Sequence, residues 1–269
     1  MVQTAQAFGN LSENLSFFRT AYDSFAQYKA VLDRLTGFHH NIDSADQLPT
    51  PNVQQQGERV ALENVSIYTP LERVLVQDLS IEVNDGDALL IQGPSGSGKT
   101  TILRTIAGVW PYCKGSVIRP SDGVLFLSQK PYLPEGSLID TLYYPNPVPE
   151  NAHEKALEVL QKVALPHLSK RLDEEHNWSH TLSLGEQQRV AFARILLIQP
   201  KVVFMDEATS AMDEGLEYAM YHLLRTNFPT LKLVSVGHRS TLHVHHTHLL
   251  TLTGEGAWEY KLMNNQATH

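Results

Sequence analysis

Large apolar residues near the N-terminus recur at steps of three, four or seven positions. This spacing predicts an amphipathic helix over residues 10–36, with Lys29 interrupting its apolar side. Residues 39–57 are polar and contain two prolines, a composition that predicts a linker. A helix beyond a linker needs a partner surface to cover its large apolar side chains. Those side chains are Leu11, Leu15, Phe18, Tyr22, Phe25, Leu32 and Leu35.

From residue 58 onward, segments with the period of a strand alternate with segments that have the period of a helix. This alternation predicts an α/β fold with a mostly parallel sheet. Residues 248–262 are predicted to form an antiparallel hairpin with Gly254 and Gly256 at its turn. The other predicted strands cover 59–70, 75–83, 87–92, 116–119, 124–127, 201–207 and 231–237, and the predicted helices cover 100–109, 150–163, 186–198 and 214–227.

Composition and charge exclude several classes of protein. The net charge of −8 gives no bulk attraction for nucleic acid, and we expect no nucleic-acid partner. Cys113 is the one cysteine, so no disulfide forms within the chain, and we interpret it as a small apolar residue. The N-terminus lacks the profile of a signal peptide, and no apolar window is long enough to span a bilayer.

A glycine-rich loop between a predicted strand and a predicted helix fits the phosphate-binding motif G-x-x-x-x-G-K-[ST]. Its glycines let backbone N–H groups converge on phosphate oxygens, and the helix N-terminus adds positive dipole character. Lys99 is expected to reach the β- and γ-phosphates, and Thr100 is expected to ligate Mg²⁺. The predicted nucleotide-binding residues of the loop are Gly93, Pro94, Ser95, Gly96, Ser97, Gly98, Lys99, Thr100 and Thr101.

Two adjacent carboxylates follow an apolar strand about a hundred residues later, in "VVFMDEATS". Asp206 is placed to hold Mg²⁺ through its water shell. Glu207, the next residue, is placed to polarise an attacking water molecule. Together with the phosphate loop, this pair predicts ATP hydrolysis with Mg²⁺ as cofactor.

The order of the phosphate loop, Gln129, "LSLGEQQR" (182–189), "VVFMDE" (202–207), "SAMD" (210–213) and His238 resembles the nucleotide-binding domain of an ABC ATPase. The resemblance covers roughly residues 58–262. It implies a P-loop NTPase fold of the ABC type. In that fold a mostly parallel core sheet accompanies an antiparallel β subdomain and a helical subdomain, here about residues 130–190.

The resemblance also assigns a role to the Ser-Leu-Gly-Glu stretch. In that family the equivalent turn binds the γ-phosphate of ATP held by the other subunit, so a head-to-tail dimer is implied. Ser183, Leu184, Gly185 and Glu186 occupy this stretch, and Leu184 and Glu186 depart from the commoner LSGGQ sequence. A serine hydroxyl, a glycine N–H and a helix N-terminus together make a physically reasonable anion site.

Four further residues take roles from the same resemblance. Gln129 corresponds to the residue that contacts Mg²⁺ and the attacking water, and it couples the site to a transmembrane partner. His238 corresponds to the histidine that contacts the γ-phosphate, and Tyr68 to the aromatic residue that stacks on adenine. Asp213 corresponds to a loop that communicates across the dimer, and its simpler role is to cap the following helix.

In finer detail the sequence is similar to those of exporter-fold half-transporters. It resembles a bacterial ATP-binding/permease group related to peptide and cobalamin uptake proteins, with the peroxisomal fatty-acyl-CoA transporters as cousins. Residues 1–38 resemble the cytoplasmic end of that group's last membrane helix, followed by the linker 39–57 and the nucleotide-binding domain 58–269. The expected partners are a transmembrane domain and a second copy of the chain. The expected location is the cytoplasmic face of a bacterial inner membrane, with this chain a soluble fragment.

Two alternatives remain for the function, and one for the histidine-rich segment. A soluble ABC-type ATPase without a transport role would share the same motifs. A regulator that binds nucleotide without hydrolysing it is disfavoured because Glu207 is present. The segment 243–248 contains four histidines, for which a surface or packing role is favoured over Zn²⁺ binding.

Overall fold

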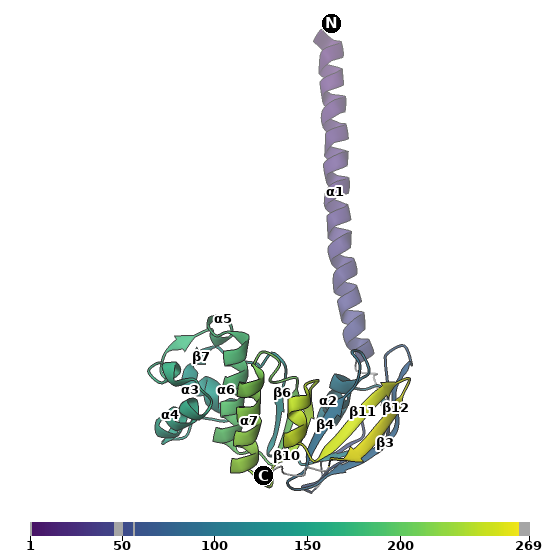
Figure 1. The fold of residues 1–269 in the computed structure, drawn as a ribbon. Coiled ribbons are helices and arrows are strands. Elements are labelled where there is room, and N and C mark those ends of the chain that lie inside the picture. The colour runs from purple at the N-terminus through teal and green to yellow at the C-terminus, as the bar shows by residue number, and fades with distance from the viewer. Residues whose placement is uncertain (1, 46–50, 56, 264–269) are drawn as a thin grey trace. The chain divides into compact units, whose positions relative to one another are not determined.

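The computed structural model describes residues 2–45, 51–55 and 57–263, with the side chains of residues 2–15 and 43–45 excepted. The chain separates into two compact units, Met1–Pro49 and Thr50–His269. The first unit contains a single helix, and the second contains the sheets and the remaining helices (Figure 1).

Helix α1 runs from Val2 to Ala45 without a break. Its described side chains, residues 16–42, are all exposed, and many of them are large and apolar. Besides the predicted stripe, a second row at helical spacing contains Phe17, Tyr28, Val31, Phe38 and Ile42. The apolar surface of this helix is therefore wider than the sequence pattern predicted. Among the described residues, no helix combines the length and the apolar character that crossing a bilayer requires.

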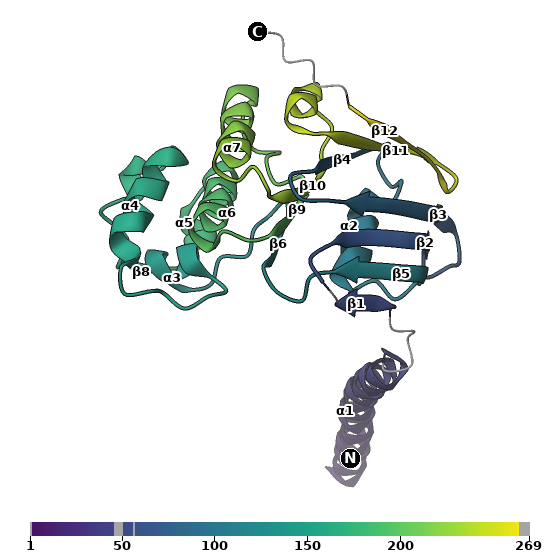
Figure 2. The ribbon, with the colours of Figure 1, turned by 90° about the horizontal axis from the view of Figure 1, so that it is seen from below.

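The second unit contains a four-stranded and a six-stranded sheet (Figure 2), besides a short two-stranded sheet among its helices. The four-stranded sheet has the order β1-β5-β2-β3, and the six-stranded sheet has the order β12-β11-β4-β10-β9-β6. In the larger sheet every neighbouring pair is parallel except the hairpin of β11 with β12. The strands are β1 (Val53–Gln55), β2 (Val60–Tyr68), β3 (Val74–Val83), β4 (Ala88–Gln92), β5 (Cys113–Arg119), β6 (Val124–Leu127), β9 (Val202–Asp206), β10 (Lys232–Val236), β11 (His248–Gly254) and β12 (Ala257–Leu262).

Helix α2 (Lys99–Ala107) contacts strands of both sheets. Its apolar residues Ile102, Leu103 and Ile106 are buried in one cluster with side chains from β2, β3, β4 and β9. Burial of such side chains stabilises the unit by roughly 2 kcal/mol each. This packing fixes the N-terminus of α2, where the phosphate loop ends.

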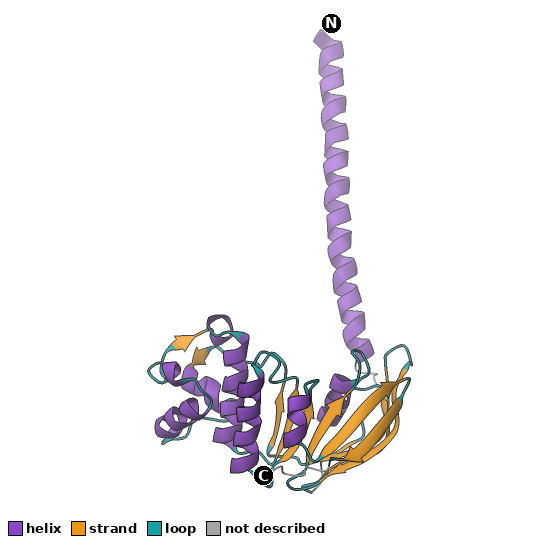
Figure 3. Ribbon diagram, in the orientation of Figure 1, coloured by secondary structure: helices purple, strands orange, loops and turns teal. Residues whose placement is uncertain are grey.

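The remaining elements form mostly one layer of helices, visible as the purple group beside the strands in Figure 3, whereas the 3₁₀ helix at 240–245 lies against β4 and the helix at 214–227. Trp178 is fully buried in this layer and donates from Nε1 to the carbonyl oxygen of Gly136 at 2.9 Å. The elements are β7 (Gly136–Ser137), α3 (Leu138–Tyr143), α4 (Ala152–Lys162), η1 (Pro166–Leu168), β8 (Glu175–His176), α5 (Trp178–Thr181), α6 (Leu184–Ile198), α7 (Glu214–Asn227) and η2 (Ser240–His245). The predicted fold class, with core sheet, β subdomain and helical subdomain, is confirmed.

The predicted linker 39–57 is too long at both ends. Helix α1 continues to Ala45, because residues 39–45 contain neither glycine nor proline and polar residues do not by themselves end a helix. At the other end, Val53–Gln55 form β1, which pairs in parallel with β5. Backbone hydrogen bonds, such as Val117 N–H to the carbonyl of Asn52 at 2.9 Å, build this pairing. This strand was not predicted because the sequence around residues 53–55 is polar.

The histidine-rich segment has the packing role that the sequence favoured. His245 and His246 are buried, and the ring of each lies against Tyr221. Burial lowers the pKa of His245 to about 4 and the pKa of His246 to about 3. Within the described part of the chain, no three His, Cys, Asp or Glu residues gather as a metal site.

These buried histidines make the stability of the domain depend on pH. Below pH 6.5 the unfolded chain binds a proton that folded His246 excludes, so the unfolding free energy should fall as the pH drops toward 3. One such histidine costs about 2 kcal/mol at pH 5. Denaturant titrations at pH 7 and pH 5 should show a smaller loss for His246→Gln than for the wild type. Exposed His180→Gln is the control, and equal losses in all three proteins would contradict this assignment.

Candidate functional site

The phosphate loop joins the end of β4 to the start of α2. Gly93, Gly96 and Gly98 all have positive φ values, which favour glycine. At Gly93 a Cβ would lie 2.6 Å from the carbonyl oxygen of Leu252, so a side chain does not fit. The Lys99 side chain bends back toward the loop, and its ammonium donates to the carbonyls of Gly93 (2.9 Å) and Pro94 (2.8 Å). The loop lies between a strand and a helix, as its sequence context predicted.

A cavity of about 320 Å³ lies against this loop. Trp110 and Glu207 line it together with residues of the loop. The buried hydroxyl of Ser97 has no hydrogen-bond partner in the structure, although it lies in the loop that borders this cavity. The cavity is lined by Thr69, Leu75, Ser95, Gly96, Gly98, Lys99, Thr100, Thr101, Trp110 and Glu207.

Charged groups of opposite sign face each other beside the loop. Thr100 donates from Oγ1 to a carboxylate oxygen of Asp206 at 3.0 Å. Burial raises the pKa of Asp206, and the neighbouring Glu207 carboxylate raises it further, while the Thr100 hydrogen bond opposes both. Burial lowers the pKa of Lys99, and Glu207 and Asp206 oppose that shift. A hydroxyl and a carboxylate thus stand together as hard oxygen donors.

Glu207 and His238 follow two neighbouring strands, β9 and β10. Glu207 has a φ of 50°, unusual for a residue with a side chain, and its N–H donates to the carbonyl of Val236 at 3.1 Å. His238 Nε2 lies 3.3 Å from Oε1 of Glu207. Both side chains are partly exposed, and Glu207 also lines the cavity. The structure brings these two predicted residues together.

Gln129 comes just after β6, at the same edge of the sheet. Its side chain is exposed, whereas its backbone carbonyl accepts a hydrogen bond from Nε2 of Gln188 at 2.8 Å. The loop is therefore held by its backbone, and the Gln129 amide is left accessible.

The stretch 183–186 begins helix α6 but does not line the cavity of the same chain. Ser183 is the N-cap, and Glu186 completes a capping box with it. The Glu186 carboxylate accepts from the Ser183 hydroxyl at 2.7 Å and lies 2.9 Å from Nε2 of His167. Ser183 and Leu184 are exposed, so another molecule has access to this helix N-terminus. The phosphate loop and this helix N-terminus thus belong to separate surfaces of one chain.

Asp213 caps the helix that follows it, as the simpler of its two predicted roles requires. Its carboxylate accepts from the N–H of Leu216 at 2.8 Å. The residue itself remains exposed.

The aromatic residue beside the phosphate loop is Trp110, which the sequence analysis did not select. Trp110 lines the cavity, and its Nε1 donates to the backbone carbonyl of Tyr68 at 2.9 Å. Tyr68 does not line the cavity, and the ammonium of Lys114 lies 5.5 Å from the centre of its ring. Tyr68 ends β2, and the next residue, Thr69, lines the cavity instead. The sequence could have indicated Trp110, because it is an aromatic residue that lies shortly after the helix following the phosphate loop.

The family model described as ABC transporter matches residues 76–210 of this chain, half of its length. This chain belongs to the ABC transporter family. The matched segment includes the phosphate loop, Gln129, the stretch 183–186, and both Asp206 and Glu207. The chain is thus an ATP-binding domain of a family of ATPases, as its motifs indicated.

Individual relatives are similar over most of this chain. An uncharacterised ABC transporter ATP-binding protein of Haemophilus influenzae is 50% identical over 225 residues, which is 84% of this chain and 38% of that protein. The lysosomal cobalamin transporter ABCD4 of Homo sapiens is 40% identical over 213 residues, covering 74% of this chain and 35% of that protein. The chain therefore spans well under half the length of these relatives.

A solved structure shows the same fold. The structure of a bacterial Atm1-family ABC exporter with ATP bound has a TM-score of 0.66 at 24% identity. It covers 80% of this chain and 40% of the exporter chain. The family resemblance and the fold class inferred from the sequence are both confirmed.

Proposed function

We propose that this chain is the motor domain of a membrane transporter, in which two copies close head to tail around ATP and hydrolysis reopens them. The observation that carries this proposal is an incomplete site. The cavity of one chain contains the phosphate loop, a catalytic carboxylate and a histidine beside it, but not residues 183–186. A second copy supplies the missing donors to the γ-phosphate.

The phosphate loop holds the triphosphate of ATP. The loop N–H groups and the N-terminus of α2 face the cavity, where they stabilise negative charge. Lys99 already bends toward the loop, and it exchanges its two carbonyl partners for the β- and γ-phosphates when ATP binds. Ser97, whose buried hydroxyl has no partner, is available as an additional donor.

Thr100, Asp206 and Gln129 fit a magnesium site. They offer hydroxyl, carboxylate and amide oxygens, the hard donors that Mg²⁺ takes, and two of them are already 3.0 Å apart. A single carboxylate is sufficient, because Mg²⁺ in nucleotide sites takes its other ligands from phosphates and water. When bound, Mg²⁺ offsets the charge of the phosphates.

Glu207 and His238 act on the side of the cavity where the γ-phosphate lies. Glu207 accepts a proton of the attacking water as the water oxygen bonds to the γ-phosphorus, while the bond from that phosphorus to the β,γ-bridging oxygen breaks and ADP leaves. His238, within 3.3 Å of that carboxylate, donates to a γ-phosphate oxygen and orients the carboxylate. The exposed amide of Gln129 holds the water in line.

The adenine ring lies against Trp110 in this proposal. The indole lines the same cavity as the phosphate loop, so a base extending from phosphates bound in the loop has an aromatic surface within that cavity. An aromatic plane supplies stacking energy of about 1–3 kcal/mol for each base. Its Nε1 bond to the carbonyl of Tyr68 fixes the indole ring before nucleotide arrives.

Replacing Trp110 should therefore weaken nucleotide binding. We expect Trp110→Ala to raise the Kd for ATP about tenfold, because stacking is lost. Tyr68→Ala is the matched control and should change the Kd less than about twofold. Calorimetry with ATP, alongside thermal unfolding of each variant, measures both. If Tyr68→Ala weakened binding while Trp110→Ala did not, the base would lie on Tyr68.

A membrane domain is the second proposed partner. The relatives are more than twice as long as the matched segment, and those with informative names are transporters. Helix α1 exposes two rows of large apolar residues along its described side chains. We assign residues 1–38 to the cytoplasmic end of the last membrane helix, with this domain at the cytoplasmic face of a bacterial inner membrane. A soluble ABC-type ATPase would leave these apolar rows without a function.

Changing the proposed base should separate binding from hydrolysis. In Glu207→Gln the amide keeps the shape but takes no proton, so hydrolysis should fall by roughly two orders of magnitude while ATP still binds. The variant should accumulate as an ATP-dependent dimer. Adding Ser183→Arg should abolish that dimer, because the bulky arginine side chain occupies the position of the γ-phosphate bound by the other copy. Size-exclusion chromatography with light scattering decides this, and Glu207→Gln that turns over normally would remove Glu207 from its role.

A further inference from the structure

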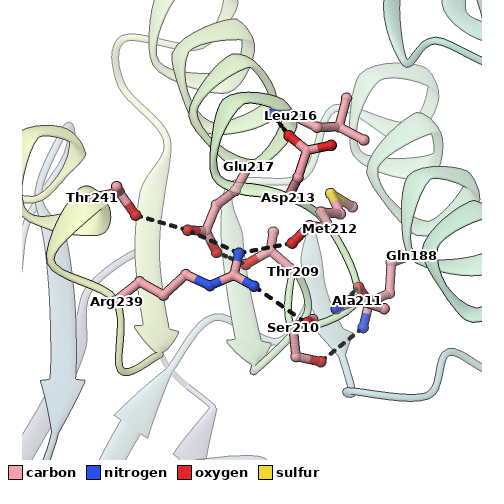
Figure 4. A network of polar contacts seen from close by, with 10 residues as sticks. All are labelled: Gln188, Thr209, Ser210, Ala211, Met212, Asp213, Leu216, Glu217, Arg239 and Thr241. Atoms are coloured by element: carbon pink, nitrogen blue, oxygen red, sulfur yellow. Dashed lines mark hydrogen bonds and ion pairs between the residues drawn. The ribbon is translucent and has the colours of Figure 1, made fainter.

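One glutamine side chain joins three separate functional segments. Gln188 lies on α6, is fully buried, and uses both ends of its amide. Its Nε2 donates to the carbonyl of Gln129 at 2.8 Å and to the hydroxyl of Ser210 at 3.2 Å. Its Oε1 accepts from the N–H of Ala211 at 3.0 Å. Figure 4 shows this amide at the edge of the segment 209–213, in contact with Ser210 and Ala211.

The opposite side of the segment 209–213 is held by residues next to His238. Arg239 donates to the backbone carbonyls of Met212 (2.8 Å) and Ser210 (3.5 Å). Its guanidinium also lies 3.5 Å from the buried carboxylate of Glu217, which accepts from the hydroxyls of Thr209 and Thr241 (Figure 4). The segment 209–213 therefore connects α6 with the loop that carries His238.

Helix α6 and the segment 209–213 are closely packed. A Cβ on Gly185 would lie 3.0 Å from the backbone carbonyl of Ala211, so the first turn of α6 and the segment lie nearly in contact. Buried amide groups that lose a partner cost about 1–3 kcal/mol each. Small independent movements of α6, of residues 210–213 or of Gln129 would break the Gln188 bonds. These three segments therefore tend to move as one unit.

We propose that Gln188 is a positioning residue that couples the two nucleotide sites of the dimer. This inference rests on the proposed dimer, in which Ser183 faces the nucleotide of the partner subunit and Asp213 lies in the loop that communicates across the dimer. When that nucleotide displaces the first turn of α6 and the segment 210–213, Gln188 transmits the movement to the backbone of Gln129. The exposed Gln129 amide of the same chain is thereby aligned for hydrolysis. Each site then turns over faster when the other is occupied.

The neighbouring Gln187 provides a matched control. It has the same side chain, is similarly buried, and lies on the same helix. It donates only within the helical layer, to the carbonyls of Ser179 (2.9 Å) and Leu182 (2.8 Å). A purely structural role for buried glutamines would give the same result at both positions.

The test compares Gln188→Met with Gln187→Met in the 269-residue chain, by steady-state ATP hydrolysis, ATP binding and thermal unfolding. Gln188→Met should lower kcat about tenfold and bring the Hill coefficient for ATP to 1, while the Kd for ATP changes less than about twofold. Gln187→Met should keep the wild-type kcat and Hill coefficient at a comparable loss of thermal stability. Gln188→Glu keeps the acceptor for Ala211 but loses the donor to Gln129, so it should behave like Gln188→Met.

Three outcomes would overturn the coupling role. They are Gln188→Met with wild-type kcat and Hill coefficient, Gln187→Met with the same kinetic loss, or Gln188→Glu with wild-type kinetics. Failure of the dimer itself looks different. A wild-type chain that hydrolyses ATP as a monomer, with a Hill coefficient of 1, would contradict the proposed function and this role together.

Discussion

Four neighbouring parallel strands, in the order β4-β10-β9-β6, end at one edge of the larger sheet, and the catalytic groups follow those ends. The phosphate loop follows β4, His238 follows β10, Asp206 ends β9 with Glu207 directly after it, and Gln129 follows β6. Backbone pairing fixes the strand spacing, so segments distant in the sequence converge without any long side-chain network. The packing of α2 between the sheets holds the phosphate loop at this edge. The rest of the site depends on this arrangement.

The same arrangement leaves the site incomplete. The edge of the sheet supplies one lysine, one phosphate loop and a pair of carboxylates, whereas residues 183–186 begin a helix outside the cavity. A triphosphate with a developing charge on its γ-phosphate needs donors on both sides. In the proposed dimer the N-terminus of α6 from a second copy meets that need, and the contacts of Gln188 relate the two sites. Exposed apolar rows on α1 suit a membrane domain that holds the copies together.

Local patterns in the sequence predicted what depends on local physics. The glycine spacing of the phosphate loop, the carboxylates after β9 and the cap at Asp213 all follow from neighbouring residues. Pattern alone did not show that Trp110 rather than Tyr68 faces the cavity, because that depends on strand pleating and on α2 packing. Nor did it distinguish Gln188 from Gln187, two identical neighbours whose contacts differ only in the folded chain. The strand β1 and the end of α1 were missed because backbone pairing and helix continuation are compatible with polar residues.

The central claim is that each ATP lies between the phosphate loop of one copy and residues 183–186 of another. Mixing two inactive variants, Lys99→Ala and Ser183→Arg, tests it most directly. A mixed dimer contains one site with both defects and one intact site. The mixture should recover up to roughly a quarter of the wild-type ATPase rate, since random pairing makes half of the dimers mixed. A mixture that forms mixed dimers but is no more active than its two components would contradict the claim.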